Sequence, residues 1–180
     1  DAVRRILRVK FRMGVFDAPS PANRATSLQP IGTPAHRAVA REAVRKSLVL
    51  LKNNGVLPIR PNATVLVAGD GANSIAMQSG GWTLSWQGAD NGPNDFPGAT
   101  SIYEGLKAQI EASGGQALLS PDGTSPQKPD VAIVVFGEKP YAEFMGDQSD
   151  VALHHNNVES LELIRNLKKQ GIPVVAVMMS

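Results

Sequence analysis

The sequence contains no cysteine, which excludes disulfide bonds, catalysis by a thiol and zinc sites built from thiolates. Aromatic residues are only 5% of the chain, and no run of lysine and arginine alternates with aromatic side chains. The formal net charge of +2 therefore does not indicate a nucleic-acid partner. Apolar runs fall well short of the roughly 20 residues that a membrane-spanning helix needs. The composition, 42% hydrophobic and 19% charged, is that of an ordinary globular domain.

Apolar runs alternate with amphipathic segments along most of the chain. Val131–Phe136 is apolar and mostly β-branched, which is typical of a strand buried on both faces. Further strands are predicted at 64–68, at 116–119 as an edge strand, and at 172–179, with a strand-like run at 47–51. Helices are predicted at 1–13, 34–48, 100–112 and 157–169, with Thr33 and Thr100 as N-caps and Leu161, Ile164 and Leu167 facing inward from the last helix. We therefore expect an α/β fold, with a mostly parallel sheet flanked by helices in flavodoxin- or Rossmann-like layering.

The composition divides the chain into three parts. Residues 1–14 form an amphipathic helix that opens on the first residue. Residues 15–34 are rich in proline, serine and threonine, which is typical of an extended interdomain linker. Residues 35–180 carry the alternating pattern, and no helix follows their last strand. We expect a piece of a larger protein whose final domain is incomplete at the C-terminus.

An acidic loop follows the predicted strand at 131–136, where open α/β sheets carry their functional loops. Within it, Glu143 is flanked by Phe144 and Met145, and apolar neighbours would raise the pKa of its carboxyl group by disfavouring the charged form. A carboxyl group that stays protonated near neutral pH suits a general acid. Glu138 is a competing candidate, and on the residues alone a solvated loop without a catalytic role is the more common case.

Both tryptophans of the chain, Trp82 and Trp86, fall between glycines in one polar segment. Such a segment could present aromatic faces to the C–H side of a sugar ring, while nearby polar groups bind the hydroxyls. The same residues could instead pack in the core. The sequence alone favours neither interpretation.

Two weaker patterns have a structural explanation that we favour. Gly69-Asp70-Gly71-Ala72-Asn73-Ser74 resembles a dinucleotide turn, but its third glycine is replaced by serine and no acidic residue follows where a ribose would be held. A tight turn between strand and helix is the simpler interpretation. His154 and His155 lie near Asp147 and Asp150, yet adjacent side chains in an extended segment point opposite ways and cannot easily share a metal ion.

Three ordered segments resemble glycoside hydrolase family 3, more narrowly its β-glucosidase and exo-β-glucanase branch. They are His36–Asn53, Gly80–Gly88 (GGWTLSWQG) and Gly137–Glu143 (GEKPYAE). The resemblance implies an N-terminal (β/α)8 barrel, a linker and an (α/β)6 sandwich domain, with the active site between the two domains. Residues 1–14 would then be the last helix of the barrel, 15–34 the linker, and 35–180 most of the sandwich.

The resemblance also implies a retaining mechanism whose nucleophile is an aspartate on the barrel. It makes Glu143 the general acid/base and gives Glu138 no catalytic part. Trp86 would form one side of a clamp on the aglycone-side sugar, with Trp82 in the same wall. No cofactor or metal ion is implied. No residue of this chain matches the nucleophile motif, so the chain should not hydrolyse glycosides without the barrel.

The implied function is part of an exo-acting β-glucosidase that releases terminal β-D-glucosyl residues from β-glucans or gluco-oligosaccharides. Its partners would be that substrate and the barrel of the same polypeptide, and its location, by analogy, secreted or periplasmic. The alternatives from other classes are a non-catalytic sugar- or nucleotide-binding α/β module and a scaffold domain without a ligand.

Overall fold

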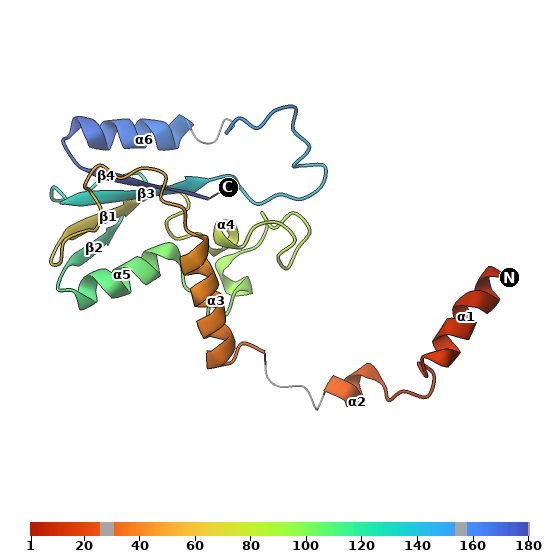
Figure 1. Cartoon of the computed structure of the whole chain (residues 1–180). Coiled ribbons are helices and arrows are strands. Elements are labelled where there is room, and N and C mark those ends of the chain that lie inside the picture. Colours follow the sequence, from red (N-terminus) through yellow and green to blue (C-terminus); the bar gives the residue numbers. More distant parts are fainter. Residues whose placement is uncertain (26–30, 154–157, 180) are drawn as a thin grey trace. The chain divides into compact units, whose positions relative to one another are not determined.

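The structure, a computed structural model, describes residues 1–25, 31–153 and 158–179. The chain divides into two compact units, Asp1–Leu51 and Lys52–Ser180. The first unit is helical and the second contains the sheet (Figure 1).

The first unit consists of helices α1 (Ala2–Arg12), α2 (Pro21–Ala25) and α3 (Pro34–Ser47). The helices predicted for α1 and α3 are confirmed. The Thr33 hydroxyl accepts a hydrogen bond from the His36 N–H at 3.3 Å, so the predicted N-cap is confirmed too. Helix α2 was not predicted, because its five residues lie within the stretch that we expected to be extended.

The strand-like run predicted at 47–51 is wrong. Residues 48–51 form neither strand nor helix, although the backbone of Leu48 is extended. The side chains of Leu48, Val49, Leu50 and Leu51 are between 67% and 85% exposed. An apolar segment becomes a strand only where a neighbouring strand can pair with it. In the part of the chain that the structure describes, none does.

The second unit is built on a four-stranded parallel sheet in the order β2-β1-β3-β4. The strands are β1 (Thr64–Ala68), β2 (Gln116–Leu119), β3 (Val131–Gly137) and β4 (Val174–Met179). Val65 pairs with Ala117 on one side and with Val131 on the other. The predicted parallel α/β fold is confirmed, with β2 as the expected edge strand.

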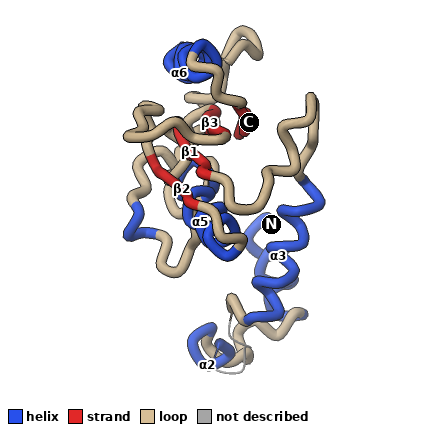
Figure 2. The backbone as a smooth tube through the Cα atoms, turned by 90° about the vertical axis from the view of Figure 1, so that its left-hand side faces the viewer, coloured by secondary structure: helices blue, strands red, loops and turns tan. Residues whose placement is uncertain are grey.

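Helices cover both faces of this sheet. Helix α5 (Ile102–Ala112) lies on one face and α6 (Val158–Lys169) on the other, as Figures 1 and 2 show from two directions. Val65, Val67 and Val135 pack towards α5, while Leu66 and Val134 pack towards α6. All five side chains are fully buried. Helix α4 (Ile75–Ser79) and the 3-10 helix η1 (Pro93–Asp95) lie in the long connection between β1 and α5. Within the described residues, no helix has the length and apolar character to cross a membrane.

Two details of the predicted helices are wrong. Leu161 is 46% exposed, and the buried stripe of α6 contains Leu163 in its place, beside Ile164 and Leu167. The N-cap of α5 is Ser101, one residue later than predicted. The Ser101 hydroxyl accepts the N–H of Glu104 at 3.0 Å, and the Glu104 carboxylate accepts the N–H of Ser101 at 2.7 Å. This reciprocal capping box satisfies two backbone donors, which explains why the helix starts there.

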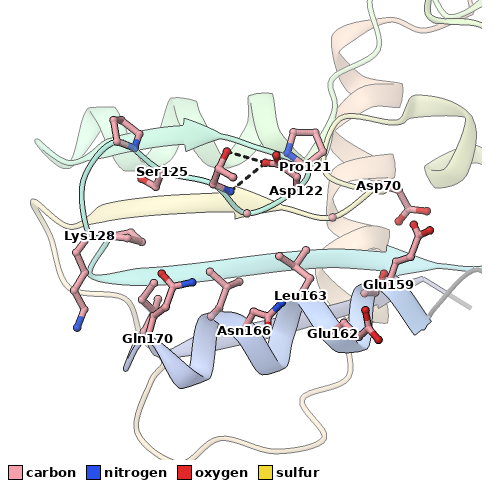
Figure 3. Close-up of a pocket in the computed structure, with 18 of the residues that line it drawn as sticks. Asp70, Pro121, Asp122, Ser125, Lys128, Glu159, Glu162, Leu163, Asn166 and Gln170 are labelled. Atoms are coloured by element: carbon pink, nitrogen blue, oxygen red, sulfur yellow. Dashed lines mark hydrogen bonds between the residues drawn. The ribbon is translucent and has the colours of Figure 1, made fainter.

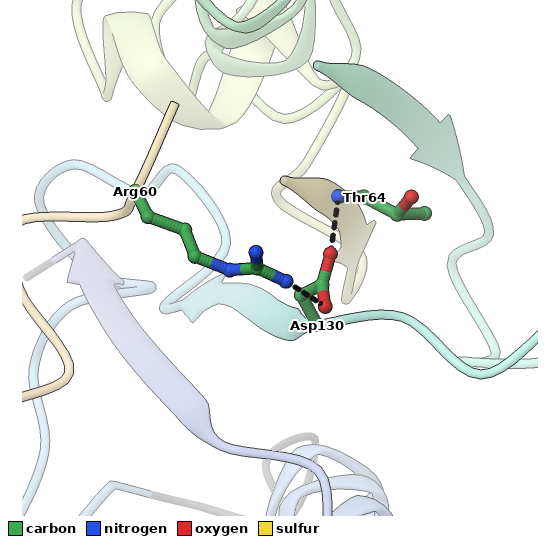
Figure 4. A network of polar contacts seen from close by, with 3 residues as sticks. All are labelled: Arg60, Thr64 and Asp130. Carbon is green, nitrogen blue, oxygen red and sulfur yellow. Dashed lines mark hydrogen bonds and ion pairs between the residues drawn. The ribbon is translucent and has the colours of Figure 1, made fainter. Parts of the chain in front are cut away.

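A polar network fixes the amino end of the sheet (Figure 4). The Asp130 carboxylate accepts the backbone N–H of Thr64 at 2.8 Å and forms an ion pair with Arg60. The Thr64 N–H first, and the Arg60 guanidinium second, hold the pKa of Asp130 below its ordinary value. The backbone N–H of Asp130 also donates to the Thr64 carbonyl at 2.9 Å. The starts of β1 and β3 are thereby tied together, and the opposite, carboxyl ends carry the loops described next.

Candidate active site

The two segments singled out in the sequence both follow the carboxyl ends of central strands. The tryptophan loop (residues 80–91) lies in the connection after β1, and the acid loop (residues 138–147) follows β3 directly. Parallel neighbouring strands bring their carboxyl ends to one edge of the sheet, which is where open α/β folds bind ligands. The topology therefore delivers both loops to the same edge.

Hydrogen bonds within the tryptophan loop and to the end of α4 hold its shape. The N–H of Trp82 donates to the carbonyl of Trp86 at 2.9 Å. The Thr83 hydroxyl donates to the Ser79 carbonyl at 2.9 Å, and the Asn91 side chain donates to the Thr83 carbonyl at 2.6 Å. These bonds give a defined shape to a loop whose residues form neither helix nor strand.

Three hydrogen bonds join the tryptophan loop to the acid loop. The indole N–H of Trp86 donates to the Glu143 carboxylate, with Nε1 and Oε2 2.8 Å apart. The Gln87 side chain accepts the N–H of Ala142 at 2.7 Å and donates to the carbonyl of Glu143 at 3.0 Å. The two predicted site residues Trp86 and Glu143, distant in sequence, are therefore in direct contact.

The backbones of the two loops also touch. A Cβ atom added to Gly81 would lie 1.9 Å from the carbonyl oxygen of Tyr141, far closer than real atoms approach. Any residue with a side chain would thus push the loops apart. Gly81 is needed here for close approach of two backbones.

The aromatic side chains of the two loops form a cluster that faces solvent. The ring centroids of Trp82 and Trp86 are 6.1 Å apart, and those of Trp86 and Phe144 are 5.6 Å apart in an edge-on arrangement. Trp82 is 67% exposed, Trp86 46% and Phe144 73%. This exposure excludes the core-packing interpretation of the tryptophans. An exposed aromatic cluster of this kind is typical of a ligand-binding surface.

The backbone of the site is strained. Among the described residues, four other than glycine have φ in the left-handed region, and Trp82, Leu84 and Phe144 are three of them. Such conformations cost on the order of 1–3 kcal/mol each and persist where the surrounding contacts impose them. The strain concentrates in the two loops that carry the candidate residues.

The expected rise in the pKa of Glu143 is wrong. The hydrogen bond from the Trp86 indole, helped by the backbone and more weakly by the Trp82 indole, lowers the pKa of Glu143 below its ordinary value. Desolvation opposes this effect but is the weaker influence. Phe144 and Met145 were expected to bury the carboxyl group, but they are 73% and 66% exposed. The Trp86 N–H therefore faces the Glu143 carboxyl group, where apolar side chains were expected, and it favours the ionised form in this chain.

Glu138, the competing acid, has a partner of its own. The Tyr141 hydroxyl donates to the Glu138 carboxylate at 2.9 Å, and this bond raises the pKa of Tyr141. Glu138 is half-buried at the base of the loop, and its backbone N–H donates to the Met179 carbonyl of β4 at 3.2 Å. These contacts fit a role in anchoring the loop.

The glycine turn after β1 is explained by packing. Gly69 has φ of +90°, and a Cβ atom there would lie 2.1 Å from the Val135 carbonyl oxygen of β3. The N–H of Gly71 donates to that same carbonyl at 3.1 Å. The glycines thus permit a tight turn against the neighbouring strand, which is the interpretation favoured from the sequence.

A cleft of about 940 Å³ lies between residues 121–129 and α6 (Figure 3), and the residues of the aromatic cluster are not part of its lining. Its lining includes the carboxylates of Asp70, Asp122, Glu159 and Glu162. Among the described lining residues only Lys128 is cationic, and Figure 3 shows it at the end opposite Asp70 and Glu159. Carboxylates of this density repel a pyrophosphate. The cleft therefore does not favour the nucleotide-binding alternative.

The acids of this cleft do not indicate a metal site. Asp122 is engaged locally, because its carboxylate accepts the Ser120 hydroxyl at 2.6 Å and the Thr124 N–H at 3.0 Å, and these bonds lower its pKa. No group of three or more metal-binding side chains occurs in the part of the chain that is described. His154 and His155 lie outside the described residues.

Two residues of the site were not predicted from the sequence. Gln87 holds the acid loop, and Phe144 joins the aromatic cluster by turning its backbone into the left-handed region at φ of 71°. Gln87 directly follows Trp86 in the segment quoted above, and this adjacency was the only signal that could have pointed to it.

Comparison with known proteins agrees with this fold. The profile of the glycosyl hydrolase family 3 C-terminal domain matches residues 48–180. A lysosomal beta glucosidase of Dictyostelium discoideum is 34% identical over 98% of the chain, and a periplasmic beta-glucosidase of Salmonella typhimurium is 28% identical over all of it.

The crystal structure of an exo-1,3/1,4-beta-glucanase from a Pseudoalteromonas species superimposes on 98% of the chain, with a TM-score of 0.87 and 53% identity. The chain spans only about a quarter of the length of these relatives, between 23% and 27%. Because the family profile covers most of the chain, this protein belongs to glycoside hydrolase family 3 and contains its C-terminal domain.

Proposed function

We propose that this chain supplies the general acid/base and an aromatic sugar platform to an exo-acting, retaining β-glucosidase. The observation that carries the proposal is the 2.8 Å hydrogen bond between the Trp86 indole and the Glu143 carboxylate, beside exposed aromatic rings. A proton donor and a surface for a sugar ring thus occupy one place at the carboxyl edge of the sheet. The glycosidase names of the relatives support the same assignment.

In this proposal Glu143 donates a proton to the glycosidic oxygen as the leaving sugar departs, and later removes a proton from the attacking water. Trp86 and Trp82 line the aglycone side and contact the apolar face of that sugar. Trp86 has a second task, because its N–H orients the carboxylate. Glu138 takes no part in the chemistry.

Because the pKa of Glu143 is lowered in this chain, the rest of the active site has to raise it before Glu143 can act as an acid. An ionised Glu143 can act as a base but cannot protonate a leaving group. A retaining glycosidase places a second carboxylate about 5–5.5 Å from the first, and a like charge at that distance raises the pKa of its neighbour. We assign this nucleophile to a barrel domain of the same polypeptide. Its arrival, with the burial that it brings, would convert Glu143 into an acid.

The larger assignments follow from the same reasoning. Residues 1–14 are proposed as the last helix of the barrel, 15–34 as the linker and 35–180 as the sandwich domain. The substrate is proposed to be a terminal β-D-glucosyl residue of a β-glucan or gluco-oligosaccharide. The lysosomal and periplasmic names of two relatives support a location outside the cytoplasm, secreted or periplasmic.

The test is the Glu143→Gln variant of the intact polypeptide, assayed on two classes of β-glucoside. A disaccharide has a poor leaving group and needs protonation, so kcat/KM should fall by about 10²–10⁴-fold, the usual contribution of general acid–base catalysis. A dinitrophenyl glucoside needs no acid and should lose far less in the glycosylation step. Azide should then restore turnover of the activated substrate by replacing the water that Glu143 no longer activates.

The matched control is Glu138→Gln, the same chemical change five positions earlier in the acid loop. It should leave the ratio of the two substrates unchanged, because an amide oxygen can still accept the Tyr141 hydroxyl. If Glu138→Gln produced the leaving-group dependence and Glu143→Gln did not, the assignment would be wrong. Equal losses on both substrates in Glu143→Gln, without azide rescue, would also contradict it.

A further inference from the structure

Gln87 belongs to the tryptophan loop, and its side chain bonds to the backbone of the acid loop on either side of the Ala142–Glu143 peptide bond. Its amide oxygen accepts the N–H of Ala142 at 2.7 Å, and its amide nitrogen donates to the carbonyl of Glu143 at 3.0 Å. Glutamine has one acceptor and one donor group at the end of its side chain, and here both are used at once. The side chain is half-buried and is followed by the buried Gly88.

These bonds differ in kind from the one made by Trp86. The Trp86 indole binds the Glu143 carboxylate itself, and a carboxyl group that transfers a proton changes its acceptor strength during each turnover. Gln87 binds only backbone groups, which do not titrate. Its two bonds therefore persist whichever protonation state Glu143 adopts.

The acid loop needs such an external support. The Glu138 N–H ties the start of the loop to Met179 of β4, but the backbone hydrogen bonds within residues 142–147 are local ones, from the Gly146 N–H to the Ala142 carbonyl at 2.9 Å and from the Asp147 N–H to the Phe144 carbonyl at 3.2 Å. They close a turn around Glu143 but do not fix that turn against the sheet. The turn also holds Phe144 in a left-handed conformation, which neighbouring contacts have to impose.

We propose that Gln87 is a positioning residue for Glu143, which fixes the distance between the proton donor and the aromatic platform by clamping the Ala142–Glu143 peptide. This proposal rests on the proposed acid/base function of Glu143. Without the clamp the turn moves relative to Trp86. A displacement near 1 Å costs about a hundredfold in a reaction that depends on alignment.

The test is Gln87→Met in the intact polypeptide, because methionine keeps the length of the side chain and removes both hydrogen bonds. On a β-linked gluco-disaccharide, kcat/KM should fall by about tenfold to a hundredfold, mainly through kcat. On a dinitrophenyl glucoside, whose departure needs no proton, it should fall less than threefold. Gln87→Glu keeps an acceptor for the Ala142 N–H and loses the donor, so its loss on the disaccharide should be smaller than that of Gln87→Met.

Gln78→Met is the matched control. Gln78 makes the same kind of double backbone contact, to the Thr100 carbonyl at 3.3 Å and the Ile102 N–H at 2.9 Å, but it touches neither Ala142 nor Glu143. It should lower the melting temperature without changing the ratio of the two substrates. Equal losses on both substrates in Gln87→Met would reduce Gln87 to a structural role, and undiminished disaccharide activity would exclude any role. Because Glu143→Gln is assayed alongside, a failure of the acid/base assignment itself would appear there, whatever Gln87→Met does.

Discussion

The close approach of Gly81 to Tyr141 gives the sharpest test of the site as a single geometric unit. In Gly81→Ala the new Cβ atom would begin 1.9 Å from the Tyr141 carbonyl oxygen, whereas real Cβ contacts do not fall below 3.0 Å. Subtracting one from the other leaves about 1.1 Å by which the two loops must part. Both atoms belong to backbone or lie directly on it, so no flexible side chain can absorb the shift.

A separation of this size breaks the contacts between the loops. Stretching the 2.7 Å and 2.8 Å bonds that Gln87 and Trp86 make to the acid loop by about 1.1 Å takes them to about 3.8 Å and 3.9 Å, beyond hydrogen-bond range. Misplacement by about 1 Å typically costs a hundredfold in rate, or about 2.7 kcal/mol of transition-state stabilisation. We therefore expect kcat/KM on a gluco-disaccharide to fall about a hundredfold in the intact polypeptide.

The assay is steady-state hydrolysis of the disaccharide and of a dinitrophenyl glucoside, with thermal melting measured on the same samples. Gly92→Ala is the control, because Gly92 has φ of −102° and its added Cβ atom would meet nothing closer than the Asp95 carboxylate at 3.7 Å. It should keep wild-type activity. If Gly81→Ala kept disaccharide activity within threefold of the wild type, the contact that joins the loops would not exist in solution, and the reasoning would fail.

Two further predictions concern the pKa of Glu143 and the stability of α5. In this chain, tryptophan fluorescence should titrate with a midpoint below the ordinary glutamate pKa, because Trp86 binds the ionised carboxylate, and Glu143→Gln should abolish that transition. Because the pKa of Glu143 is lower in the folded chain, the Trp86–Glu143 bond stabilises the fold fully above the ordinary glutamate pKa and is lost as pH falls through the lower folded value. A midpoint above the ordinary value would therefore refute the lowered pKa. Gly105→Ala should raise the free energy of unfolding by about 0.5–1 kcal/mol in urea denaturation, since alanine favours the helix and the new Cβ atom would meet only the Thr100 methyl at 4.0 Å; an unchanged or lower value would contradict this.

The fold could be predicted because the strands of the sheet and the helices that cover it show their apolar positions in short stretches of sequence. Val131–Phe136 is short, mostly β-branched and contains no polar residue, which favours a strand covered on both faces, and all of its residues but Phe136 are buried. The strand-like run at 47–51 is also mostly apolar but has no strand beside it, and composition cannot report the absence of a partner. The prediction that Leu161 faces inward is wrong for a related reason, because packing decides which side of α6 is turned towards the sheet.

The candidate residues come from the resemblance of their segments to the family, since the residues alone favour a solvated loop at Glu143 and neither interpretation of Trp82 and Trp86. The structure adds that Glu143 and Trp86 are in contact across 57 positions of sequence. The sequence predicts the wrong direction for the pKa of Glu143, because its neighbours in sequence, Phe144 and Met145, are not the groups that face its carboxylate. Nothing local in the sequence indicates Gln87, because its partners Ala142 and Glu143 lie more than fifty positions away.

The contact at Gly81 also restricts how enzymes of this kind can be redesigned. A tryptophan loop transplanted from a relative with a different backbone path would transmit its misfit directly to the Tyr141 carbonyl, and so to Glu143, the proposed acid/base. Chimaeras should therefore exchange the tryptophan loop and the acid loop as a matched pair. The side chain of Leu84 is 69% exposed and takes no part in this contact, so a substitution there that tolerates its φ of 61° is the safer route to altered aglycone preference.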